Sequence, residues 1–273
     1  MENIIIYLKY IILGLIQGIT EILPVSSSGH LVIFQTLLNV KEPGLTFEMF
    51  TNMASLIAMI ILFYKDIWKL IKATWFFLFY KEKRDEFKSD FLYVVKLIIA
   101  LIPIGIFGFI FRKQMGDIKN LLTVGISLMI TGTLLLLIYF TRNISEEHEE
   151  VTFKDATFMG ITQIGAIFPG VSRSGSTIIG GRINRLSLPS VLKFSFLLYI
   201  LISIPTSALS LYEVITLSES INWIGYSLSF LVTLAATYFT ARLVMKRLKV
   251  EHLIYFGIYC VIIGLAVFTI FFI

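Results

Sequence analysis

Two short polar segments interrupt otherwise apolar stretches of this chain, and their residue types could carry out chemistry. Segment 24–30 reads Pro-Val-Ser-Ser-Ser-Gly-His, and segment 169–177 reads Pro-Gly-Val-Ser-Arg-Ser-Gly-Ser-Thr. Hydroxyls, a histidine and an arginine are costly to place in apolar surroundings, so they usually serve a function or meet a partner. The two segments therefore predict a polar site that is built twice and completed differently in each copy.

The first segment offers the groups of an activated nucleophile. Gln17 and Glu21 precede it four residues apart, so they share one helix face. A carboxylate (Glu21), a hydroxyl (Ser27) and an imidazole (His30) near one turn can deprotonate and orient an attacking group. The alternatives are tight helix packing for the serines and a backbone hydrogen bond for His30. A carboxylate at membrane depth favours the functional interpretation of the cluster.

The second segment offers a site for an anion. Arg173 carries a planar guanidinium, which grips phosphate through paired N–H donors. Its neighbours add hydroxyls and free backbone N–H groups at the start of a helix, where anions are favoured. They are Gly170, Ser172, Ser174, Gly175, Ser176 and Thr177. The alternative is a purely structural Arg173–Glu21 ion pair, and both interpretations hold if the pair opens when phosphate binds.

The composition is that of a membrane protein. Of the 273 residues, 57% are hydrophobic and 15% are charged, and the mean hydropathy is +0.86. Six apolar runs have the length of about 20 residues that crosses a bilayer. They are 44–64, 91–111, 120–141, 190–212, 222–244 and 252–273. The net charge of +5 has no dominant basic patch, which disfavours nucleic-acid binding.

Two further apolar runs are broken in the middle and predict re-entrant helical hairpins. The run 3–40 has arms at 4–22 and 27–38, and the run 155–185 has arms at 156–168 and 173–181. The second arms are too short to span a bilayer. Irregular backbone at membrane depth needs protein or a water-filled cavity to satisfy it, so each break is a candidate site.

The two halves of the chain align with each other at an offset of 146 residues, as from Gly14 to Gly160 and from Gln17 to Gln163. At this offset Arg173 is the counterpart of Ser27. Each hairpin is followed by three spans, and an odd number of spans inverts the second copy relative to the first. We therefore expect an all-α inverted repeat in a single membrane domain, 1–273. Repeat 1 covers about 1–141 and repeat 2 about 155–273, with a cytoplasmic linker at about 142–154.

Loop charge predicts the orientation. The loops 65–90 and 242–249 are rich in Lys and Arg and should be cytoplasmic. Both chain termini then lie outside, the first hairpin enters from outside and the second from inside. Arg112, Lys113 and Lys119 fall on the outer side and count against this scheme. Glu48 and Asn52, four residues apart in the first span, either face the site or form an interhelical hydrogen bond.

The two motifs resemble the signatures of the bacterial undecaprenyl-diphosphate phosphatases of the bacitracin-resistance type. The resemblance rests on Gln17-Gly18-Ile19-Thr20-Glu21 with segment 24–30, and on segment 169–177, and it covers the whole chain. It implies a multi-pass protein of the bacterial plasma membrane with its site on the extracytoplasmic face. The implied reaction removes the terminal phosphate of undecaprenyl diphosphate, which returns the lipid carrier to peptidoglycan synthesis and confers bacitracin resistance.

Carried over by position, the resemblance implies Ser27 as the nucleophile, Glu21 and His30 as acid/base and orienting groups, and Arg173 as the phosphate clamp. The implied phosphate-binding residues are Ser26, Ser28, Gly170, Ser172, Ser174 and Thr177. A divalent cation, Mg²⁺ or Ca²⁺, supports the family's activity, with Glu21 and Gln17 as candidate ligands. Gln17 stands where the family also allows Glu, which weakens models with two carboxylates on the cation. The motif leaves open whether Ser27 or His30 attacks phosphorus.

Two other functions compete with this interpretation. Inverted repeats with broken helices are a transporter plan, so a lipid-phosphate flippase could use the same pocket. Another class of lipid phosphatases uses a histidine nucleophile, but it needs a second histidine after its Ser-Arg element. No histidine occurs between Arg173 and His252. The expected partners are undecaprenyl diphosphate and membrane lipids, with no nucleic acid, and a homodimer is among the assemblies that the sequence leaves open.

Overall fold

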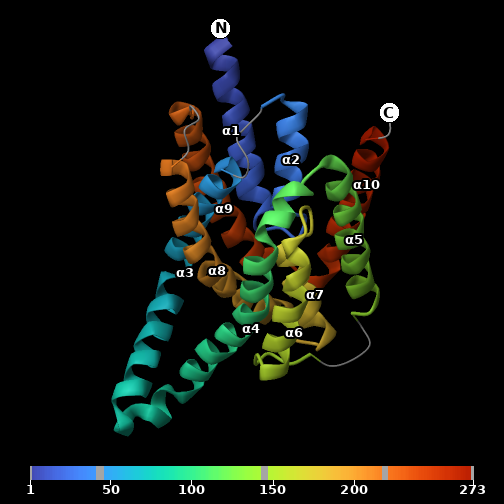
Figure 1. Cartoon of the computed structure of the whole chain (residues 1–273). Coiled ribbons are helices and arrows are strands. Elements are labelled where there is room, and N and C mark those ends of the chain that lie inside the picture. The colour runs from blue at the N-terminus through green and yellow to red at the C-terminus, as the bar shows by residue number, and fades with distance from the viewer. Residues whose placement is uncertain (1, 41–45, 143–146, 217–220, 272–273) are drawn as a thin grey trace.

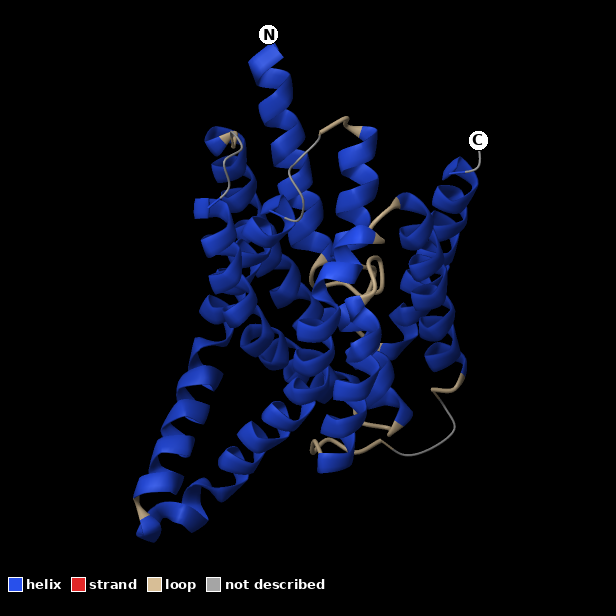
Figure 2. Cartoon of the chain, in the orientation of Figure 1, coloured by secondary structure: helices blue, strands red, loops and turns tan. Residues whose placement is uncertain are grey.

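The computed structural model describes residues 2–40, 46–142, 147–216 and 221–271. The described residues are predominantly helical, and no strand occurs among them (Figure 2). The helices are α1 (Glu2–Thr20), α2 (Ser27–Leu37), α3 (Thr46–Phe79), α4 (Arg84–Asp117), α5 (Leu121–Phe140), α6 (Phe153–Gln163), α7 (Arg173–Ile183), α8 (Leu188–Thr216), α9 (Trp223–Arg247) and α10 (Leu253–Phe271). Three short 3-10 turns, Lys81–Lys83, Ile164–Ile167 and Val250–His252, adjoin them.

Six helical segments in the described ranges are long and apolar enough to cross a bilayer. They are Thr46–Phe79, Lys81–Phe111, Leu121–Phe140, Leu188–Leu209, Trp223–Arg247 and Val250–Phe271. Each overlaps one of the six predicted spans, so that prediction is confirmed. Large apolar side chains such as Phe109 and Leu231 lie exposed on these helices, as expected for surfaces that face lipid.

The predicted loop 65–90 is wrong, because most of it is helical. α3 continues to Phe79 and α4 already begins at Arg84, with one 3-10 turn between them. The segment contains no glycine or proline to end a helix. The non-helical backbone of Phe63 (φ −102°, ψ 16°) bends α3 instead. The two helices therefore extend beyond the bundle and meet at the end opposite the N-terminus (Figure 1). Part of the predicted linker, 143–146, lies outside the described residues.

Two pairs of helices, α1–α2 and α6–α7, enter the bundle from opposite ends (Figure 1). Their connecting turns meet in the middle of the molecule. The Ser174 hydroxyl donates to the Leu23 carbonyl over 3.0 Å, and the Gly170 N–H donates to the Ser28 hydroxyl over 3.4 Å. The two polar segments, about 146 residues apart in sequence, are therefore neighbours in the fold.

Glycines let the surrounding helices approach closely and hold the two turns in place. A Cβ on Gly14 of α1 would lie 2.6 Å from the Ser229 carbonyl oxygen of α9. A Cβ on Gly160 of α6 would lie 2.7 Å from the Ala100 carbonyl oxygen of α4. α5 and α10 pack along each other in the same way at Gly132. Small residues at helix contacts are typical of membrane bundles.

Candidate active site

Two helix N-termini point at the same place, and each begins with a residue that the sequence singles out. α2 begins at Ser27, and Ser26 caps it by accepting the Gly29 N–H. α7 begins at Arg173, and Ser172 caps it by accepting the Gly175 N–H. A capping serine satisfies one N–H of the first turn, and the remaining N–H groups and the helix dipole attract an anion. The arrangement favours a phosphate between the two helix starts.

Glu21 is the centre of the hydrogen-bond network at this meeting point. Its side chain is 2% exposed and forms an ion pair with Arg173. Its second oxygen, Oε2, accepts the Ser27 hydroxyl over 2.5 Å and the Gln17 amide over 2.9 Å. A carboxylate this close to a hydroxyl is within reach of its proton.

Arg173 is held in position by an aromatic ring. Its guanidinium carbon lies 4.0 Å from the centroid of the Tyr199 ring of α8, and its side chain keeps 27% of its surface exposed. The Tyr199 hydroxyl donates to the Asn52 carbonyl oxygen over 3.2 Å. This stacking fixes the plane of the guanidinium while leaving some of its N–H donors available for a ligand.

His30 faces away from Glu21. Its Nδ1 lies 2.7 Å from the Ser26 carbonyl oxygen, which can only accept, so Nδ1 carries the proton. Its Nε2 lies 2.7 Å from the Tyr259 hydroxyl of α10, and the two rings stack at 5.5 Å. The Ser26 backbone has φ 71°, a strained value for a residue with a side chain. His30 thus clamps the turn that presents Ser27.

A cavity of about 290 Å³ lies between the two helix starts. Most of the predicted site residues line it: Glu21, Ser26, Ser27, Ser28, Ser172, Arg173 and Ser174. Glu48 and Asn52 line it too, so they face the site and also form contacts, Glu48 with Lys119 and Asn52 with Gln17. Gln17, His30, Gly170 and Thr177 lie behind the lining, and the Thr177 hydroxyl bonds Ser195 over 2.6 Å.

The cavity is lined by three side chains that carry oxygen atoms, Glu21, Glu48 and Asn52, each already in contact with a cation or an amide: Arg173, Lys119 and Gln17 respectively. Within the described part of the chain, no group of three or more His, Cys, Asp or Glu side chains could hold a metal by itself. Mg²⁺ commonly uses only one or two carboxylates together with water and substrate phosphates. Glu21, Glu48 and the Asn52 side chain supply such a set from one cavity.

The comparison with protein families decides where the chain belongs. A model described as bacitracin resistance protein BacA matches residues 10–266. This chain is a member of that family.

Relatives in the BacA family align with almost the whole chain. An undecaprenyl-diphosphatase of Acholeplasma laidlawii is 42% identical over 278 residues, 99% of each chain. An undecaprenyl-diphosphatase of Oceanobacillus iheyensis is 40% identical and covers 97% of each chain. Undecaprenyl-diphosphatase 1 of Bacillus licheniformis is 37% identical over 97% of this chain and 98% of its own. Together with its six apolar helices, this makes the BacA member a multi-pass membrane protein.

Two aromatic residues of this BacA member were not predicted, although they hold the site together. Tyr199 stacks on Arg173, and Tyr259 stacks on His30. Both lie in long apolar runs, where a tyrosine has no distinguishing sequence context. Their partners lie 26 and 229 residues away in sequence (199 − 173 and 259 − 30), so only the folded structure reveals them.

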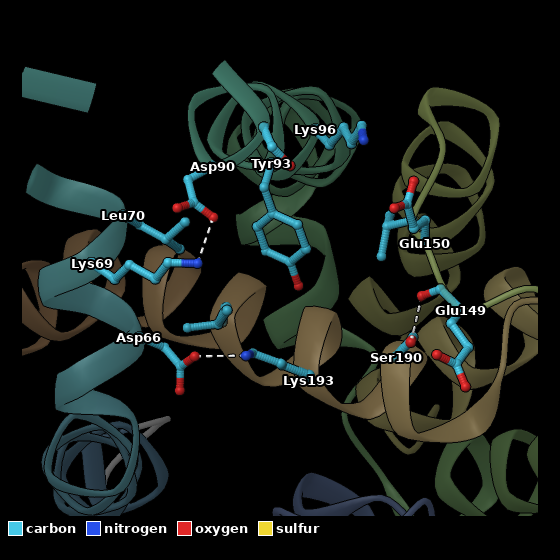
Figure 3. A pocket seen from close by; sticks show the side chains of 13 residues that line it. Asp66, Lys69, Leu70, Asp90, Tyr93, Lys96, Glu149, Glu150, Ser190 and Lys193 are labelled. Atoms are coloured by element: carbon cyan, nitrogen blue, oxygen red, sulfur yellow. Dashed lines mark hydrogen bonds and ion pairs between the residues drawn. The ribbon is translucent and has the colours of Figure 1, made fainter. Parts of the chain in front are cut away.

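A second polar cavity, of about 270 Å³, lies among α3, α4 and α8 (Figure 3). Two of its lysines form ion pairs: Lys69 with Asp90 over 2.8 Å, and Lys193 with Asp66 over 2.6 Å. The Lys96 ammonium lies over the Phe153 ring. Because these cations already have partners, we interpret this cavity as a structural cluster and not as the phosphate site.

Proposed function

We propose that this chain hydrolyses undecaprenyl diphosphate to undecaprenyl phosphate and inorganic phosphate in the cavity between the two helix starts. The observation that carries the proposal is the chain of contacts Ser27–Glu21–Arg173, which joins a nucleophile, a base and a phosphate clamp. The names of the relatives agree with this activity. The reaction returns the lipid carrier to cell-wall synthesis, which accounts for resistance to bacitracin.

The proposed architecture is an inverted repeat with two re-entrant hairpins, repeat 1 at about 1–141 and repeat 2 at about 155–273. Equivalent contacts support it. Gly14 meets α9, the fourth helix of repeat 2, and its counterpart Gly160 meets α4, the fourth helix of repeat 1. The serine caps of α2 and α7 are also equivalent at the offset of 146. The basic α3–α4 junction lies opposite the N-terminus (Figure 1), which supports a cytoplasmic junction in the plasma membrane and a site serving the outer face.

In the first step, Glu21 takes the proton of Ser27 while the serine oxygen attacks the terminal phosphorus. A bond forms between this oxygen and phosphorus, and the bond from phosphorus to the bridging oxygen breaks. Undecaprenyl phosphate leaves with the electron pair of that bond. The charge that develops on the phosphoryl oxygens is stabilised by Arg173 and by the N–H groups of the two helix starts.

In the second step, water hydrolyses the phosphoserine. Glu21 gives the proton that it took in the first step to the departing Ser27 oxygen, and the attacking water keeps its protons in the inorganic phosphate that leaves, so the enzyme returns to its starting state. Arg173 contacts Glu21 when no phosphate is bound and turns its fork to the phosphate when substrate enters. Both interpretations of the Arg173–Glu21 ion pair then hold: it is a structural contact in the empty enzyme, and it opens when phosphate binds.

His30 is a positioning residue in this proposal and Ser27 is the nucleophile. Both ring nitrogens of His30 have partners, the Ser26 carbonyl and the Tyr259 hydroxyl. Attack by His30 on phosphorus would require Nε2 to leave Tyr259 and turn toward a cavity that it does not line. Ser27 lines the cavity and already contacts its base.

Glu21 and Glu48, with the Asn52 side chain, would hold a divalent cation, for which Mg²⁺ is the best match. Such an ion, when bound, neutralises charge on the diphosphate. Gln17 supports this set from behind, because its amide donates to both Glu21 and Asn52. It orients the carboxylate and contributes no charge.

Purified protein is expected to release inorganic phosphate from undecaprenyl diphosphate in a colorimetric assay. Chelation with EDTA should stop release, and added Mg²⁺ should restore it, because the cavity alone supplies too few positive charges for a diphosphate. The matched control is the same assay with undecaprenyl phosphate, which should yield no phosphate above background. Full activity in EDTA after exhaustive dialysis would rule out the cation, and absent release under all conditions would rule out the phosphatase.

Tyr259→Phe is expected to lower kcat about fivefold, the effect of one lost hydrogen bond. The substitution keeps the ring that stacks on His30 but removes the hydroxyl that binds Nε2. Steady-state phosphate release measures the change, and KM should stay the same. Tyr255→Phe is the control, since Tyr255 lies on the same helix and is 69% exposed. Equal kcat in both variants would show that His30 needs no support from Tyr259.

A further inference from the structure

An apolar groove of about 450 Å³ runs beside the candidate active site, between α5 and the α6–α7 pair. On α5 it is lined by Ile126, Ile130 and Leu134, which are four residues apart and therefore share one helix face. These three side chains are 38–49% exposed. Phe168, 50% exposed, lines the groove beside the second polar segment. The groove is thus an apolar surface that stays exposed in the described part of the chain.

Two hydroxyls in the groove wall, one on α7 and one on α6, bond to their own helices. The Ser176 hydroxyl donates to the Ser172 carbonyl over 2.9 Å, and the Thr162 hydroxyl donates to the Phe158 carbonyl over 2.9 Å. Both hydroxyls are satisfied by their own helix, so they offer little to a polar ligand. The surface suits a hydrocarbon chain.

The groove adjoins the catalytic cavity. Val171, two residues before Arg173, lines both spaces. Gly165 lines the groove, and the next residue, Ala166, lines the cavity. One short segment, 165–171, therefore separates a charged space from an apolar one.

We infer that the prenyl tail of the diphosphate substrate leaves the catalytic cavity over Val171 and lies in this groove. The inference rests on the proposed function and extends it to the other end of the substrate. The substrate has a charged head and an apolar chain, and the two adjoining spaces have the same polarity. Because the bilayer is as apolar as the groove, the groove cannot attract the tail by hydrophobicity. It directs the chain by shape, so filling it should hinder the entry of long-chain substrates.

Gly165→Leu adds a bulky apolar side chain to the groove wall, where Gly165 lies. A Cβ at Gly165 would meet no atom within 4 Å, so the substitution should be compatible with the fold. We expect kcat/KM for undecaprenyl diphosphate to fall at least about tenfold, the scale on which a pocket rejects a chain that no longer fits. For a diphosphate with one isoprene unit, kcat/KM should change less than about twofold, since so short a chain does not reach past Val171.

Gly108→Leu is the matched control, because a Cβ at Gly108 of α4 also meets open space and Gly108 lines neither the groove nor the cavity. It should leave both substrates unaffected. Ile130→Trp fills the groove from the opposite wall and should act like Gly165→Leu. Leu137→Trp, on the same helix but outside the groove, is its control. Equal losses for long and short substrates, or no loss for either, would overturn the inference.

A second measurement needs no turnover. A prenyl diphosphate carrying a photoreactive group in its second isoprene unit should label groove residues of the wild-type protein, as located by mass spectrometry. Unlabelled undecaprenyl diphosphate should suppress this labelling. Labelling that it does not suppress would assign the groove to bilayer lipid and reject the inference. If wild-type protein hydrolysed no diphosphate, the proposed function would fail. The labelling would still show whether the prenyl chain lies in the groove.

Discussion

Replacing Arg173 by alanine is expected to lower kcat for phosphate release about 10²- to 10³-fold, the cost of losing one donor to a developing oxyanion. The substitution removes the guanidinium that Tyr199 holds over the cavity. It also leaves the buried Glu21 carboxylate without its cation, which should destabilise the fold by about 3–5 kcal/mol. Activity is therefore compared per folded molecule, with thermal unfolding measured alongside.

Arg173→Lys separates charge from geometry. Lysine keeps the positive charge near Glu21 but cannot present two parallel N–H donors to a phosphate. We expect near-normal thermal stability and a loss of activity between those of wild type and Arg173→Ala. An Arg173→Ala variant that is folded and retains full kcat would show that another cation clamps the phosphate.

Ser27→Ala is expected to lower kcat by at least about 10⁴-fold, as with other lost nucleophiles. The serine hydroxyl contacts the Glu21 carboxylate over 2.5 Å at the start of α2. Its removal takes away the attacking atom and leaves the neighbouring caps unchanged. Single-turnover phosphate release, which detects slow residual activity, is the appropriate measurement.

Ser28→Ala is the comparison for this variant. Ser28 also lines the cavity, but its hydroxyl contacts Ser26 and the Gly170 N–H instead of Glu21. We expect a loss of about tenfold or less, since the affected hydrogen bonds are neutral and, at 3.4 Å each, long. If Ser27→Ala were no worse than Ser28→Ala, the attack would have to come from His30 or directly from water.

The sequence predicts the six spans and the two broken runs well, because apolar length and Pro, Gly and Ser breaks are local signals. It also places Ser27 and Arg173 correctly at helix starts, since each follows a serine that can cap a helix. Their proximity was an expectation from the repeat alone. In the structure Glu21 joins the two residues, because it forms an ion pair with Arg173 and accepts the Ser27 hydroxyl.

Other features depend on contacts between distant segments and could not be predicted. From the sequence, Glu48 and Asn52 either face the site or bond to another helix. In the fold both residues line the cavity, and Asn52 also accepts a hydrogen bond from Gln17 of α1. The serines of the second segment likewise divide, Ser174 lining the cavity and Ser176 the apolar groove. The alternation follows from how α7 is rotated, which is set by packing against neighbouring helices and not by its own sequence.

The proposed hydrolysis of a lipid-carrier diphosphate takes place at one site, built from both helix starts. It is tested most directly by reconstituting the purified protein in liposomes with undecaprenyl diphosphate that is radiolabelled in its terminal phosphate. Label is expected to appear as inorganic phosphate in equal amount to undecaprenyl phosphate, and Ser27→Ala should stop the formation of both. Movement of intact labelled lipid between leaflets, without release of phosphate, would contradict the account and identify a flippase instead.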